Sequence, residues 1–440
     1  MNKCKLKRIV LGAAFFFLLA VPIDGQERIT INQCYEWAEA NYPLIHRQGL
    51  IRETEGYNLA NASRAWLPGV TLSAKASYQS AVTKLPFDAE KLAAVVPSLS
   101  IPVLPKDQYQ AVAEVNQLLW DGGVIRSARS LTRAEAEADR KQLEADLYAL
   151  RERVNQLYFG SLLQSELLRQ NALLQEQLAV NHDRIAAMMT GGLANLSDLE
   201  SIEVELLGAR QQAIELTASR TAYLRMLAVW IGRPIDNPED LAIPILPVEA
   251  YSTLRTITRP ELHVFDARSH LFEVQNAQLT AALMPRFGLF AQGGYGRPGL
   301  NMLSEAFDAF YIAGVRMSWN LGRLYTLRDD RRKLDAARRG VEIQRETFLF
   351  NTRLQQTEQQ TMIRKAQELM RADSAILRLR SNIREAAEVK LTNGVIATSD
   401  LIREINAESL ARQTEATHRM QELMAVYTYL HTTGNTNEQE

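Results

Sequence analysis

VTLSAKASYQ, residues 70–79, alternates strictly between apolar and polar side chains. An alternation with a period of two predicts a β-strand whose two faces meet different surroundings. Residues 109–116, 287–295 and 311–319 follow the same pattern. Each segment is close to the length of a tilted membrane-spanning strand, which is about 9–11 residues. We therefore predict strands over 70–80, 108–120, 286–297 and 309–320.

Aromatic side chains stand near the ends of these strands, where a membrane strand carries an aromatic girdle. They are Tyr78, Tyr109, Tyr295, Tyr311 and Trp319. A soluble four-stranded sheet with one wet face fits the strands alone equally well. The helices and the N-terminus favour the membrane interpretation.

Four strands are too few to close a membrane barrel, because such barrels begin at about eight strands. An open sheet edge in lipid would leave backbone N–H and C=O groups unpaired at high cost. The chain must then pair with copies of itself. Two copies would give about eight strands and a filled interior, whereas three would give about twelve strands and a lumen.

The chain also contains an internal duplication. Leu67-Pro68 opens the first strand pair as Met284-Pro285 opens the second, and residues 115–122 match residues 315–322. The segment TGGLANLSDL, residues 190–199, matches TNGVIATSDL, residues 392–401. Because the matches keep their order along the chain, we predict two tandem structural repeats.

Proline-free stretches predict long helices. None of the 14 prolines lies between Pro105 and Pro234 or after Pro298. A seam with alternating spacings of four and three residues is typical of a coiled coil and comprises Leu143, Leu147, Leu150, Val154 and Leu157. Ser197 and Ser399 are candidate N-caps of the shorter helices that follow the turns at Gly192 and Gly394.

These patterns divide the chain into consecutive parts. A signal peptide over 1–25 precedes a first repeat over 26–231, with helices at 30–66, 124–190 and 197–231. An equatorial linker over 232–258 precedes a second repeat over 259–433, with helices at 260–284, 325–391 and 399–433. A short helix stacked on another would match one long helix in length. Residues 434–440 form a polar tail, which we expect to be disordered.

The N-terminus predicts export. Basic residues from Lys3 to Arg8 precede an apolar run from Ile9 to Val21, which is too short to span a bilayer. After removal of residues 1–25 only Cys34 remains, so no internal disulfide can form. The net charge of −1 leaves no basic surplus for nucleic acid.

Together these residues resemble the TolC-type outer membrane factor family over nearly the whole mature chain. The resemblance rests on the Pro-anchored strands, Trp120-Asp121-Gly122-Gly123 after the second strand, Arg259-Pro260-Glu261-Leu262, and the two Gly-x-x-x-x-Ser-Asp-Leu turns. It implies a mainly α protein with a membrane β-barrel contribution. Each protomer would supply four transmembrane strands and long coiled-coil helices. A homotrimer would form a 12-stranded barrel in outer-membrane lipid and a helical tunnel through the periplasm of a Gram-negative cell.

The resemblance also implies a function. The chain would be the passive outer-membrane duct of a tripartite efflux pump, coupled through a periplasmic adaptor to an inner-membrane transporter. The adaptor would contact the helix–turn–helix tips, which here are Thr190, Gly192, Leu193 and Ser197, and Thr392, Gly394, Val395 and Ser399.

Two acidic residues at the tips are candidates for a gate. Asp400 stands where an aspartate of the family would narrow the tunnel, and Asp198 is its repeat partner. The plain alternative is that an acid in the first helical turn interacts with the helix dipole. Arg403 and Leu391 stand where an acid and a closing tyrosine occur in some members, so a second acidic ring and a tyrosine lock are not expected.

Other classes of function find little support. The six histidines show no HExxH motif or helical metal pair, and no phosphate-binding loop occurs. We predict no catalytic residues, metal or cofactor, with Cys34 as a packed apolar residue and the helix charges mostly solvated. A type I protein secretion channel and a non-channel periplasmic coiled-coil protein stay open as alternatives, and the substrate, whether drug, metal or protein, stays open too.

Overall fold

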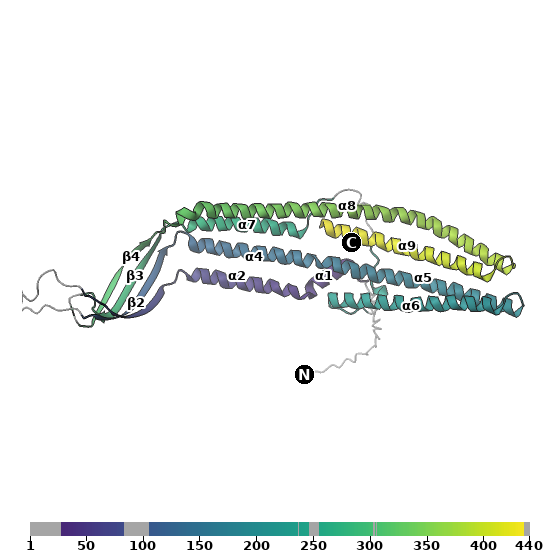
Figure 1. Ribbon diagram of the computed structural model, residues 1–440, viewed down its shortest axis with the longest axis horizontal. Helices are drawn as coiled ribbons and strands as arrows, with labels where there is room; N and C mark the ends of the chain where they lie inside the picture. Colours follow the sequence, from purple (N-terminus) through teal and green to yellow (C-terminus); the bar gives the residue numbers. More distant parts are fainter. Residues whose placement is uncertain are drawn as a thin grey trace, which may run out of the picture.

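The computed structural model describes residues 28–82, 105–235, 237–245, 255–301, 304 and 306–434. The expected signal peptide, all but the first residue of the polar tail, and parts of the first strand connection and of the equatorial linker lie outside this range. The described chain is elongated, with a β-sheet at one end and two helix–turn–helix tips at the other (Figure 1). No described helix has the apolar length needed to cross a membrane.

The sheet has four antiparallel strands in the order β1-β2-β3-β4. The strands span Gly69–Tyr78, Asp107–Trp120, Arg286–Arg297 and Asp308–Ser318. Sequential order leaves β1 and β4 as the two edges. The register pairs Val70 with Val115 and then Val115 with Ala291. Apolar residues of neighbouring strands therefore share one face.

The helices form a layer in which two short helices stack beside each long one (Figure 1). In the first repeat, α2 (Arg47–Arg64) lies on α4 (Val124–Tyr148), and α6 (Leu196–Ile231) lies on α5 (Leu150–Thr190). In the second, α7 (Pro260–Ala281) and α9 (Thr398–Thr433) lie along α8 (Arg323–Thr392). The predicted seam packs inward, because Leu143, Leu147, Val154 and Leu157 are buried.

Two of the expected helices are interrupted. The helix predicted over 30–66 is instead α1 (Ile31–Asn41), a 3₁₀ turn (Pro43–His46) and α2. Pro43 explains this break, because it cannot donate the backbone hydrogen bond that an unbroken helix needs. The helix predicted over 124–190 is divided at Ala149, which keeps helical dihedral angles. The remaining elements differ from their predicted limits by a few residues, and the strand predicted over 309–320 ends at Ser318.

The main core lies near the middle of the rod. Residues from α1, α5, α6 and α9 enclose it, including the fully buried Cys34, Leu157 and Leu227. One described part of the linker, 237–245, lies against one side of α5. Ile29 pairs with Leu241 there, and the Tyr158 hydroxyl donates to the Ala242 carbonyl at 2.6 Å.

Candidate functional site: the helical tips and the two-faced sheet

Each long helix ends in the same hydrogen-bonded turn. The Leu193 amide donates to the Met188 carbonyl and the Gly192 amide to the Met189 carbonyl, at 2.9 and 3.0 Å. Val395 and Gly394 repeat this pattern in the second tip. Gly192 and Gly394 have φ values of +74° and +68°, which favour glycine. This pair of bonds is the Schellman motif, in which glycine ends the helix and reverses the chain.

All eight residues predicted at the tips are exposed, and they fall into two groups, one at each turn. In a Schellman motif the residue after the glycine commonly packs back on its own helix. In the first tip that residue is Leu193, which is 76% exposed, and in the second it is Val395, which is 68% exposed. Each tip therefore presents an apolar side chain to the surroundings.

The two predicted serine caps are wrong. Helix α6 begins at Leu196 and its cap is Asn195, which accepts from the Asp198 amide at 3.0 Å. Helix α9 begins at Thr398 after Ala397, whose side chain has no acceptor. In both tips the Ser-Asp-Leu sequence lies inside the first turn of the helix. The side-chain oxygen of Asn195 therefore caps α6, and the helix begins before Ser197.

The gate candidates Asp198 and Asp400 do not meet. Asp198 accepts from the Asn195 amide at 3.1 Å, which completes a capping box. Asp400 accepts from the Ala397 amide at 3.3 Å and from Arg403 at 2.8 Å. Each carboxylate thus stabilises the start of its own helix. These bonds favour the dipole alternative, and an additional gating role stays a hypothesis.

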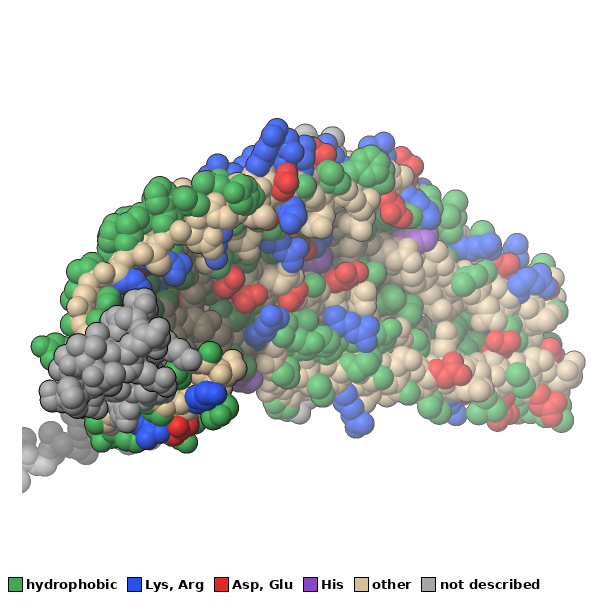
Figure 2. Space-filling view, turned by 60° about the vertical axis from the view of Figure 1, so that its left-hand side comes forward, with side chains coloured by type: hydrophobic (Ala, Val, Ile, Leu, Met, Phe, Trp, Pro, Cys, Tyr) green, Lys and Arg blue, Asp and Glu red, His purple; other side chains and the backbone are tan. Residues whose placement is uncertain are grey.

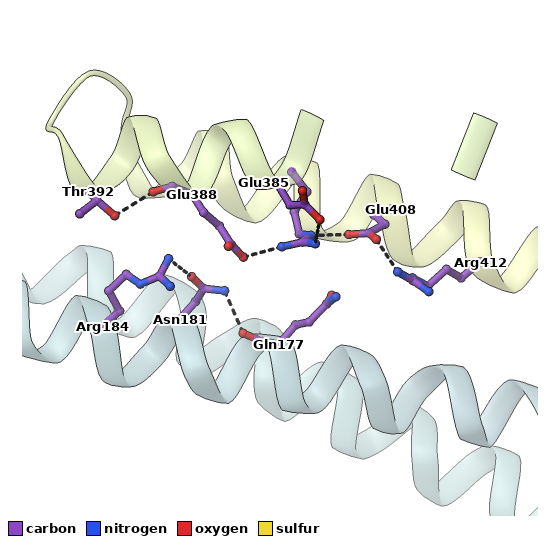
Figure 3. Close-up of polar contacts among 9 residues, drawn as sticks. Gln177, Asn181, Arg184, Glu385, Glu388, Thr392, Glu408 and Arg412 are labelled. Atoms are coloured by element: carbon purple, nitrogen blue, oxygen red, sulfur yellow. Dashed lines mark hydrogen bonds and ion pairs between the residues drawn. The ribbon is translucent and has the colours of Figure 1, made fainter. Parts of the chain in front are cut away.

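A buried ion network lies between α8 and α9, close to their tip (Figure 3). The Glu408 side chain is 0% exposed and accepts from Arg384 at 2.5 Å and from Arg412 at 2.6 Å. Arg384, 13% exposed, also donates to Glu388 at 2.8 Å. Burial raises the pKa of Glu408, but the hydrogen bonds from Arg412 and Arg384 outweigh it and hold this pKa below its usual value.

Sequence reasoning missed this network, because it treated the helix charges as mostly solvated. It also missed the neighbouring contact of Asp373 with His418, which are 2.6 Å apart and mostly buried. The spacing of Glu408 and Arg412 at i and i+4 was one available signal. A second was the depletion of apolar residues along α8.

Leu391, which stands where some family members have a closing tyrosine, is part of an apolar cluster. Leu391 is buried there among residues from α5, α6, α8 and α9. At its edge Asn406 of α9 donates to Glu205 of α6 at 3.1 Å. Cys34 is also buried, and burial raises the pKa of its thiol to about 12, so it is a packed residue without nucleophilic activation.

The sheet has one apolar and one polar face. Val70 and Leu72 of β1 and Tyr311 and Val315 of β4 point to the apolar face and are exposed. On the other face Arg316 contacts Glu114 at 3.3 Å. The aromatic residues fall near the two ends of the strands. Tyr78, Tyr109, Tyr295 and Tyr311 lie toward the far end, and Trp120 and Trp319 lie at the helical end.

Two aromatic–glycine pairs cover the polar face between strands β3 and β4. The Phe310 ring lies where a Cβ of Gly294 would stand, and the Phe290 ring lies over Gly314 in the same way. Such rings shield the backbone beside glycine. A view from the sheet end shows hydrophobic side chains along the outer side and a hollow behind, with acidic and basic groups near it (Figure 2).

No protein-family model and no curated protein sequence matches the chain. Solved structures do match it along most of its length. The outer-membrane channel OprN aligns with a TM-score of 0.62 and 15% identity, over 92% of this chain and 90% of that chain. CusC aligns with a TM-score of 0.64 and 12% identity, over 93% and 94%. The open state of the Neisseria gonorrhoeae MtrE outer membrane channel aligns with a TM-score of 0.62 and 12% identity, over 92% and 89%.

Sequence identities this low support a shared fold and nothing beyond it. The chain shares the fold of these outer-membrane channels, which confirms the mainly α fold with a small antiparallel sheet expected from its sequence.

Proposed function

We propose that this chain is one protomer of a homotrimeric export duct in the outer membrane of a Gram-negative cell. The observation that carries the proposal is the four-stranded sheet with an exposed apolar face and unpaired edges at β1 and β4. In lipid each free edge must find a partner strand. Three copies would join β4 of one to β1 of the next and close a ring of about twelve strands around a lumen.

The helical layer supports the same assembly. Exposed apolar residues at helical spacing follow α6 on one side of the layer, namely Val204, Leu207, Ile214 and Val229. Others follow α8 on the opposite side, including Ile343, Phe350, Leu354 and Leu379. Two different surfaces that meet head to tail produce a closed ring when the rotation fits. The ring would continue the sheet into a helical tunnel.

The tips are then the periplasmic end, where a partner would dock. Leu193 and Val395 would each fill an apolar pocket of a periplasmic adaptor, and the adaptor would connect the duct to an inner-membrane transporter. An efflux role is the favoured function, because the family resemblance of the sequence implies it and the solved structures that share the fold include outer-membrane channels. The duct itself would be passive, since the transporter would supply the energy.

Neighbouring residues of β1 offer a matched test. Leu72, on the apolar face, is 80% exposed, while Ser73 points to the polar face. An arginine on the lipid side near the midplane costs about 2–4 kcal/mol, whereas the lumen side tolerates it. Leu72→Arg should therefore reduce the heat-stable trimer in outer-membrane fractions, and Ser73→Arg should leave it intact with altered conductance. Equal loss in both variants would overturn the assignment of the two faces.

Particle images of the detergent-extracted protein provide an independent check. We expect a hollow cylinder with threefold symmetry. A stable, water-soluble monomer of the processed chain would rule out the duct.

A further inference from the structure

A cavity of about 680 Å³ lies between α5, α6 and α9 near the middle of the rod. Its floor is apolar, with Leu157 and Phe159 fully buried and Met420 nearly so. One side is the ring of Tyr223, which lies directly against α5. This approach requires glycine, since a Cβ on Gly160 would stand 2.8 Å from the Tyr223 ring.

The cavity opens on the side of α5 away from the linker. Its lining on α5 includes Gln156, Gly160 and Leu163, whereas a second depression formed with linker residues uses Leu162, Ser165 and Leu168. At about 100° per residue these two sets lie on roughly opposite sides of the helix. None of the described linker residues lines the cavity. In the proposed duct this side would face the lumen.

The lining combines soft apolar groups with a polar rim. Met226 and Met424 are 38% and 42% exposed at the mouth. Thioethers are flexible and polarisable, and they make favourable contacts with aromatic rings. Gln156, Gln421 and Ser219 supply hydrogen-bonding groups at the rim. A cavity of this size and composition suits a drug-sized molecule with an aromatic body.

The charge of the lining is one-sided. Arg153 is the only charged residue among those described that line the cavity. Its guanidinium donates to Gln156 at 3.1 Å, and the described residues form no ion pair with it. Neither Asp nor Glu is among the described lining residues. A guanidinium on an apolar rim favours a carboxylate, which it can bind through two parallel hydrogen bonds.

We propose that this cavity is a binding site for aromatic or other apolar molecules that carry one carboxylate. The apolar body packs on Phe159, Tyr223 and Met420, and the carboxylate accepts from Arg153. That such molecules are transported and bind this site on their way through the lumen rests on the proposed duct. The binding itself depends only on α5, α6 and α9.

A charge series tests the site on the purified protein in detergent. We would titrate it with 2-naphthoate, neutral 2-naphthamide and cationic 2-naphthylmethylamine by isothermal calorimetry. We expect naphthoate to bind most tightly. Arg153→Met should weaken naphthoate about tenfold or more, because a charge-assisted bond is lost, and should change naphthamide little. The matched control is Arg225→Met on α6, which lies outside the lining and should change nothing.

A second variant covers the case in which Arg153→Met folds poorly. Met424→Glu puts a carboxylate at the mouth and should reverse the preference from naphthoate to the cationic probe. Circular dichroism would verify helical content in each variant. Equal affinity for all three probes, or no effect of either substitution, would overturn the proposal. Because calorimetry requires no conduction, a bound probe in a protein without channel activity would refute the duct and leave the site intact.

Discussion

The two helical hairpins come from one duplicated pattern, yet different forces hold them together. In α5–α6 the buried side chains toward the tip are mainly apolar, as at Leu178, Ile185 and Ile202. In α8–α9 the equivalent depth contains Glu408 between two arginines, with Asp373 against His418 farther along. Apolar packing tolerates small slides, whereas charge pairs require one register. The second hairpin is therefore the more specifically aligned pair.

Removal of the central carboxylate should produce the largest effect. Glu408→Gln removes the buried carboxylate that Arg384 and Arg412 share, and breaking a buried ion pair costs about 3–5 kcal/mol. We expect a loss of roughly 3 kcal/mol in the free energy of unfolding. Denaturant titration followed by far-ultraviolet circular dichroism measures it.

Glu404→Gln is the matched control, one turn from Glu408 on α9. Its partner Arg380, 3.3 Å away, is 43% exposed, and such solvent-accessible pairs contribute at most about 1 kcal/mol. Similar losses of unfolding free energy in both variants would mean that burial does not distinguish the network.

For the first hairpin, Leu178→Ala should lower the free energy of unfolding by about 2–5 kcal/mol, because it leaves a cavity in the apolar core. The same denaturant titration measures it.

The contact between the two repeats at mid-rod should depend on pH. His431 of α9 stacks on Tyr148 of α4, with ring centroids 4.7 Å apart. Burial, and then the nearby Arg259, lower the pKa of His431 to about 4, and Arg151 adds a smaller effect in the same direction. The Tyr148 carbonyl and Glu261 act in the opposite direction. Because the unfolded chain binds the proton more readily, stability is full above about pH 6.5 and falls as the pH drops toward 4.

The change amounts to roughly 3 kcal/mol at most, at about 1.4 kcal/mol per pKa unit. Thermal unfolding measured at several pH values between 7 and 4 would show it. His431→Phe keeps the stacked ring and should flatten the profile over that window. An unchanged slope in this variant would assign the acid sensitivity to other groups.

The N-caps at the two tips differ by one side chain, and substitution can exchange the two residues between the tips. Asn195 caps α6, whereas Ala397 cannot cap α9. Asn195→Ala should cost about 1 kcal/mol, and Ala397→Asn should stabilise α9 by a similar amount. Hydrogen exchange of the first-turn amides would report both changes. No added protection at α9 would mean that its first turn is limited by something other than the cap.

The sequence predicted best the elements that depend on the period of the apolar residues and on where prolines interrupt the chain. The alternation at 70–79 identified β1 and its apolar face, and the proline-free stretches identified the long helices. Pro43 lies inside the helix predicted over 30–66 and interrupts it, since proline cannot donate a backbone hydrogen bond. The Glu408 network was not predictable in the same way, because Arg384 and Glu408 are distant in sequence and only packing brings them together. The cavity at Gly160 likewise depends on three helices whose faces no local pattern specifies.

The two tip aspartates give the smallest and most specific comparison. Arg403 lies 2.8 Å from Asp400 and offsets its charge, whereas Asp198 has only its cap partners among the contacts described. If acidic rings narrow the proposed lumen, Asp198→Asn should weaken cation preference more than Asp400→Asn, in single-channel recordings from planar bilayers. Arg403→Gln should then strengthen cation preference, because it releases the charge of Asp400. If all three variants conduct like the parent, the carboxylates act only as helix caps.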